Sequence, residues 1–218
     1  MPITSWSCIL LSGIALLGCG RPQGLQVGEV TISADSIQSA VDDLRITFST
    51  TGEASARWLL LDGGMGPAAI LHHRLKAESD AVLQEAQKAA DRIRAGATFS
   101  EVALSLGQNT QLRMLQPAPF AIGAIVAAKV ASLEEGEWAG PLASLDGWEL
   151  FRLEQRGGST RSRAGVALYR IRFPVGEAKD RELAEELWNS LPLSGSPEWL
   201  ATLPTEFRRG RIAPKSSP

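Results

Sequence analysis

Apolar residues in the first half of the chain recur mainly at helical spacing. Ser33 is a good N-cap for a helix over residues 33–48, and Thr98 is one for a second helix that starts at Phe99. Between them, one apolar stripe predicts a long helix that starts near Asp80 and stops before Gly96. The stripe consists of Val82, Leu83, Ala86, Ala89, Ala90 and Ile93. Residues 54–61 are apolar but too short for periodicity to decide between strand and helix.

The second half of the chain contains strand patterns. Residues 138–143 and 148–153 flank Asp146-Gly147, a hairpin signal. In the return strand Glu149, Phe151 and Leu153 share one face. Residues 166–173 alternate in the same way, and residues 124–133 and 179–191 read as helices. These patterns predict an α+β fold, in which N-terminal helices precede a small antiparallel sheet packed with helices.

The first eighteen residues differ from the rest because no charged residue precedes Arg21. The apolar run 9–17 is about half the length that a bilayer core requires, and it has the length of a signal-peptide core. It ends in Leu16-Leu17-Gly18-Cys19, which resembles the lipobox of bacterial lipoproteins.

The lipobox resemblance implies cleavage before Cys19 and acylation of that cysteine. Residues 1–18 would be the signal peptide and residues 19–32 a tether. Gly20, rather than Asp, follows the cysteine, and by the sorting rule of bacterial lipoproteins this favours transport to the outer membrane. We therefore expect an exported protein, anchored by lipid at Cys19 and facing the periplasm. The mature chain would contain no other cysteine, because Cys8 is removed with the signal.

Composition narrows the classes of function. The chain has 22 basic and 24 acidic residues and a net charge of −2, which argues against a dedicated nucleic-acid binder. Two His and two Cys do not fit the ligand spacing of a zinc module, and we expect no metal or other cofactor.

Two blocks in the right order resemble the parvulin-type prolyl isomerases over residues 80–156. The first block runs from Glu85 to Ala103 and includes Ile93-Arg-Ala-Gly96-Ala-Thr-Phe99. The second comprises Leu133-Glu-Glu-Gly136-Glu-Trp-Ala-Gly140-Pro141-Leu, Asp146-Gly147-Trp148-Glu149-Leu-Phe and Leu153-Glu-Gln-Arg156. The segment that precedes them is similar to the N-terminal part of SurA-like periplasmic chaperones.

The resemblance implies a division of the mature chain. Residues 33–79 would form an N-terminal helical segment, residues 80–163 a parvulin-like domain, and residues 164–218 a strand-helix extension, possible as a degenerate second repeat. A parvulin sheet has four antiparallel strands, with the first strand central beside the last. Either residues 57–61 or residues 166–173 could fill that central place, and the latter are the better strand by composition.

The family's polar site positions fall on different residue types here. The last-strand histidine corresponds to Glu149, the first-strand histidine to Trp58 if residues 57–61 are that strand, and the Cys/Asp position lies near Asn109. These three are the candidate catalytic positions. The apolar residues expected around a proline ring are Met114, Leu115, Phe120 and Val126.

Other polar residues receive simpler interpretations. His72 and His73 are adjacent on a predicted helix and point about 100° apart, so they are expected as a solvated or helix-capping pair. Glu149, flanked by apolar residues, is expected as a strand-edge charge, and Trp148 with Trp138 as packing residues.

Two functions remain open at this point. The resemblance implies a lipid-anchored prolyl isomerase or folding factor that acts on unfolded or extended exported polypeptides. The altered polar positions favour a non-catalytic module, similar in scaffold, that binds such polypeptides without isomerising them.

Overall fold

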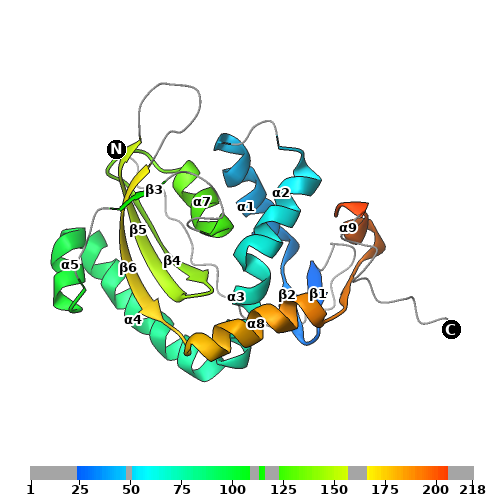
Figure 1. Ribbon diagram of the computed structural model, residues 1–218. Coiled ribbons are helices and arrows are strands. Elements are labelled where there is room, and N and C mark those ends of the chain that lie inside the picture. The colour runs from blue at the N-terminus through cyan, green and yellow to red at the C-terminus, as the bar shows by residue number, and fades with distance from the viewer. Residues whose placement is uncertain (1–23, 48–50, 109–112, 116–122, 157–165, 206–218) are drawn as a thin grey trace.

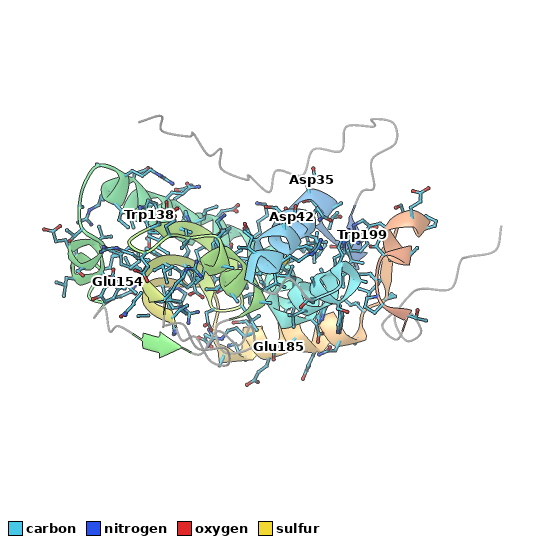
Figure 2. The ribbon with its side chains drawn as sticks, turned by 90° about the horizontal axis from the view of Figure 1, so that it is seen from above. Asp35, Asp42, Trp138, Glu154, Glu185 and Trp199 are labelled. Carbon is cyan, nitrogen blue, oxygen red and sulfur yellow. The ribbon has the colours of Figure 1, made fainter. Side chains whose placement is uncertain are left out.

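The computed structural model describes residues 24–47, 51–108, 113–115, 123–156 and 166–205 (Figure 1). Within these residues the fold is α+β, as predicted, with two antiparallel sheets at opposite ends of the molecule and helices between them. Figure 2 views the molecule from above, with Trp138 and Glu154 toward the end of the larger sheet and Trp199 toward the other.

The larger sheet has four strands in the order β3-β6-β5-β4. Its bounds are β3 Arg113–Leu115, β4 Trp138–Ser144, β5 Gly147–Arg156 and β6 Val166–Pro174. The strand that lies centrally beside β5 is therefore β6, the better of the two candidates for that place. The other candidate, residues 57–61, is wrong as a strand because it lies largely in α2, Glu53–Leu60.

The hairpin between β4 and β5 forms where Asp146-Gly147 predicts it, with Ser144 opposite Gly147. Gly147 has a φ of +121°, and an added Cβ would lie 2.2 Å from the carbonyl oxygen of Phe173 on β6. Glycine is therefore required both for the turn and for the close approach of the neighbouring strand.

Alternation along β5 and β6 gives the sheet two buried faces. Leu150, Ile171 and Phe173 pack under α4 (Lys76–Arg94) and α5 (Phe99–Ser105), while Phe151 and Leu153 pack under α7 (Ala124–Ala131). The predicted apolar stripe forms the buried side of α4, and the predicted Thr98 cap forms a capping box with Glu101. Both local predictions are confirmed.

The smaller sheet, in the order β2-β1-β7, corrects the predicted tether. Residues 25–27 and 30–32 form a hairpin of two short strands, β1 (Leu25–Val27) and β2 (Val30–Ile32), and β7 (Leu193–Gly195) pairs with β1. A tether through residue 32 is wrong because Leu25, Val27, Val30 and Ile32 alternate with polar residues and are buried against the helices.

The helices between the sheets begin with α1 (Ala34–Thr47), which matches the predicted helix over residues 33–48 and whose Ile37, Val41 and Leu44 are fully buried. After α2 the chain continues through a π-helical turn, η1 (Leu61–Met65), into α3 (Gly66–Arg74). Gly64 lies in this turn with a φ of +143°, so the two helices are joined across a kink.

The C-terminal residues 166–205 contribute to both sheets, with α8 connecting them. After β6, α8 (Ala178–Ser190) packs on α3, β7 completes the smaller sheet, and α9 (Pro197–Ala201) follows. Trp188 of α8 lies against Gly66, where an added Cβ would be 2.3 Å from the indole ring, and donates a hydrogen bond to Asp62 (3.2 Å).

These contacts correct the predicted domain boundaries. The division between residues 163 and 164 would separate β5 from β6, which are paired along nine residue positions. Residues 166–205, the described part of the predicted extension, therefore complete the two sheets and do not form a separate repeat. Among the described residues, no helix is both long and apolar enough to cross a bilayer.

Candidate functional site

Glu149 lies on β5, an inner strand, and its side chain is fully buried. The expectation of a strand-edge charge is wrong because β6 covers the edge that β5 would otherwise expose. A buried carboxylate needs an opposite charge and hydrogen-bond donors to offset its lost hydration.

Arg170 of β6 supplies the opposite charge. Its Nε and Nη2 both donate to the carboxylate of Glu149, the latter at 2.6 Å, so the ion pair is bidentate. In the strand register Glu149 lies opposite Arg172, and the pair with Arg170 is therefore diagonal across the strands. The guanidinium of Arg170 also lies 5.6 Å from the ring centre of Phe151.

The β4–β5 turn supplies a further hydrogen bond to the carboxylate of Glu149. The hydroxyl of Ser144 donates to Oε1 of Glu149, and Asp146 lies 3.5 Å from the Arg170 guanidinium. Three donor atoms, two from Arg170 and one from Ser144, thus converge on the carboxylate of Glu149 between the two central strands.

His72 joins the same turn from α3. Its Nε2 lies 3.0 Å from the carbonyl oxygen of Ser144, and its Nδ1 lies 2.6 Å from Oγ of Ser79, on α4. Trp148 donates from Nε1 to Oγ and to the carbonyl oxygen of Ser79, both at 3.1 Å, and its ring centre is 4.9 Å from that of His72. We call His72, Ser79, Ser144, Trp148, Glu149 and Arg170 the polar cluster.

The prediction of a solvated His72–His73 pair is wrong for one of the two residues. His72 is 9% exposed because α3 packs against both β4 and α4, whereas His73 is exposed and lies 3.8 Å from Glu29. Burial lowers the pKa of His72 below its ordinary value of 6.5, and backbone hydrogen bonds to Ser144 and Gly147 oppose this only in part.

Among the described residues, neither of the other two predicted catalytic residues is found beside Glu149. Trp58 lies on α2 and packs against the core formed by the N-terminal helices and the smaller sheet, so it is not a first-strand residue. Asn109 lies outside the described residues.

The predicted proline-binding residues fall in several places. Val126 on α7 is 2% exposed and packs in the core with Phe151 and Leu153. Met114 and Leu115 lie in β3, opposite Ala167 and Val166 of β6. Phe120 and the predicted lipidation residue Cys19 lie outside the described residues.

Arg170, Ser144 and Ser79 were not predicted as partners of the candidate residues. For Arg170 a signal was available: Glu149 faces away from Leu150, and Arg170 faces away from Ile171, so pairing these strands puts opposite charges on one face. Ser144 contacts Glu149 across the hairpin, five positions away, but the contacts of Ser144 with His72 and of Ser79 with Trp148 join residues 72 and 69 positions apart, for which no local pattern exists.

The chemistry of the cluster is that of a satisfied buried network. The carboxylate of Glu149 accepts from a guanidinium and a hydroxyl, so both of its oxygens are engaged by side chains of the protein itself. Among the described residues, no group of three or more His, Cys, Asp or Glu side chains is placed to hold a metal ion.

Comparisons with protein-family models, with curated proteins and with solved structures found no match to this chain.

Proposed function

We propose that the chain is an exported, lipid-anchored folding factor that binds extended segments of exported polypeptides without isomerising their prolyl bonds. The observation that carries the proposal is the fully buried Glu149, held by Arg170 and Ser144 at the position where the parvulin resemblance expects a histidine.

The proposed location of the protein depends on the N-terminal sequence. The uncharged apolar run and Leu16-Leu17-Gly18-Cys19 support export and acylation of Cys19, with the protein facing the periplasm from the outer membrane. Two or three acyl chains on one cysteine are sufficient for stable anchoring.

Binding of polypeptide is supported by the arrangement of the larger sheet. Its order places β6 centrally beside β5, in the place that a parvulin sheet gives to its first strand, although β6 follows β5 in the chain; α4 and α5 lie on one face and α7 on the other. Unfolded exported chains are the partners expected of such a scaffold behind a lipoprotein signal.

The absence of turnover follows from the chemistry of the buried pair. Isomerisation lowers a barrier of about 18–20 kcal/mol by favouring a twisted amide, which needs hydrogen-bonding groups that are free to engage it. Glu149 and Arg170 are engaged with one another, and breaking a buried ion pair costs about 3–5 kcal/mol.

Prolyl isomerisation is the second candidate, because the order of the strands favours it. Catalysis would then use groups other than the Glu149 carboxylate. A protease-coupled assay with several X–Pro peptides separates the two functions, and suppression of aggregation of a denatured outer-membrane protein measures binding. The proposal is supported if the protein suppresses aggregation while the X–Pro peptides isomerise no faster than without it. A rate proportional to protein concentration overturns the non-catalytic part, and failure to bind unfolded chains overturns the whole.

The anchor has a matched control within the chain. Cys19→Ser should move the protein out of the membrane fraction, whereas Cys8→Ser, in the signal, should leave it there. Membrane retention of Cys19→Ser would refute acylation at this residue.

A further inference from the structure

His72 lies where three elements meet. It extends from α3 to contact Ser79 on α4 and the carbonyl oxygen of Ser144 at the end of β4, and it packs against Trp148 of β5. The helix axis is interrupted at Leu75, with φ −104° and ψ 38°, so α3 and α4 are separate helices connected through one residue. The imidazole is therefore a direct link between α3 and the larger sheet.

The hydrogen bonds define one neutral tautomer. A carbonyl oxygen only accepts, so Nε2 carries the proton that is donated to Ser144. Nδ1 then accepts from the hydroxyl of Ser79, and the same oxygen accepts the N–H of Trp148. Every polar atom of this junction has a partner when the imidazole is uncharged.

A second proton on His72 would disturb this arrangement in two ways. Nδ1 would become a donor toward Oγ of Ser79, whose own proton would have to leave its present acceptor. The positive charge would also stand in a site that is 9% exposed, at a cost in hydration free energy.

Several charged groups on the surrounding elements are engaged with other partners. Glu149 and Asp146 contact Arg170; Lys76 pairs with Asp80; Glu78 accepts from the backbone of Gly176; Asp62 accepts from Trp188; and His73 lies near Glu29. The other charged residues of these helices are Arg74 on α3, Glu85, Lys88, Asp91, Arg92 and Arg94 on α4, and Lys179, Asp180, Arg181, Glu182, Glu185 and Glu186 on α8. The lowered pKa of His72 arises from burial and is opposed by backbone hydrogen bonds, with none of these charges among its causes.

We propose that His72 is an acid-sensitive latch, which holds α3 against α4 and the β4–β5 turn when neutral and releases this junction when protonated. The inference goes beyond the proposed function and does not depend on it, because its test measures the structure and not polypeptide binding.

The direction of the pH dependence follows from linkage. The pKa of His72 is lower in the folded chain than its ordinary value of 6.5, so the unfolded or opened junction binds more protons. The latch is at full strength above about pH 6.5 and weakens as the pH falls toward the lowered pKa. Over that interval the opening equilibrium rises by up to about tenfold per pH unit.

Hydrogen exchange on the full protein tests this with a control on the neighbouring residue. We expect protection of residues 66–75 and 144–149, corrected for intrinsic exchange, to fall between pH 7.5 and 5.5 in the wild type and in His73→Gln. In His72→Gln the pH dependence should disappear. Equal pH dependence in both variants, or none in the wild type, overturns the latch.

A titration of the unmodified protein keeps the test independent of whether His72→Gln folds. The chain has two histidines, so imidazole NMR signals can be assigned with His73→Gln alone. The proposal expects one histidine to titrate below 6.5, together with a shift of the Trp148 indole N–H resonance. A His72 signal that titrates at or above 6.5, or a Trp148 resonance that does not follow it, contradicts the proposal.

Discussion

Replacing Arg170 by methionine tests the buried ion pair most sharply. Methionine keeps most of the side-chain volume but removes both donors to the carboxylate of Glu149, which is fully buried. Ser144 would remain as its donor, and the charge would have no counter-ion in the interior. Removal of one partner from a buried pair costs about 3–5 kcal/mol, because the other charge is left uncompensated.

The assay is urea unfolding at pH 7.5, with the change in the free energy of unfolding as the result. Lys76→Met is the control, since Lys76 pairs with Asp80 at 2.8 Å but both side chains are more than half exposed. Exposed pairs contribute about 0–1 kcal/mol, so this variant should change stability little. The double variant Glu149→Met/Arg170→Met should recover much of the loss, because it removes both charges together.

Two results would refute this reasoning. A loss below about 1 kcal/mol in Arg170→Met would mean that Glu149 reaches water. A double variant whose loss equals the sum of the two single losses would mean that the charges do not interact in the folded chain.

Three further variants test a packing contact, a helix cap and a helix end elsewhere in the fold. Gly66→Val should cost about 2–3 kcal/mol by overlap with Trp188, whereas Gly52→Ala, with no atom within 4 Å of the added carbon, should cost at most about 1 kcal/mol; similar losses in urea unfolding would refute the contact. Thr98→Ala should cost about 1 kcal/mol and move the lowered pKa of Glu101 part of the way toward its ordinary value, since the backbone N–H of residue 98, the larger cause, still donates and only the hydroxyl is lost; an unmoved pKa by NMR would count against the side-chain half of the capping box. Arg156→Ala should lower hydrogen-exchange protection at the end of α7, because Arg156 donates to the carbonyl oxygens of Val130 and Ala131 (2.9 and 3.0 Å); unchanged protection would contradict that role.

Local patterns predicted much of the fold. Ile37, Val41 and Leu44 lie on the buried face of α1, and Thr98 caps α5, because both features depend on residues three or four positions apart. The β4–β5 hairpin formed at Asp146-Gly147 for the same reason.

Features that depend on distant pairing were missed. The hairpin of β1 and β2 has three-residue strands, too short for a periodic signal, and its third strand comes from residues 193–195. The burial of His72 depends on how α3 docks against β4; the glycines and proline of residues 63–67 mark the break before α3 but do not give the direction that α3 then takes.

The candidate site was predicted in part. Glu149 was selected by resemblance, and the structure places it in the centre of the sheet with its carboxylate engaged. Trp58 was selected on the condition that its segment is a strand, and that condition is not met. Arg170 could have been inferred once β6 was placed beside β5, since opposite charges on facing strands pair readily.

One measurement tests the central claim, that this scaffold binds extended polypeptide without prolyl turnover. Exchange spectroscopy on an unfolded, proline-containing peptide, with and without the protein, reports both properties in the same sample. We expect the peptide signals to broaden or shift on binding, with no cis–trans exchange cross-peaks beyond the uncatalysed exchange, which takes tens of seconds or longer. Exchange cross-peaks that appear on adding the protein, or peptide signals that do not change at all, would contradict it.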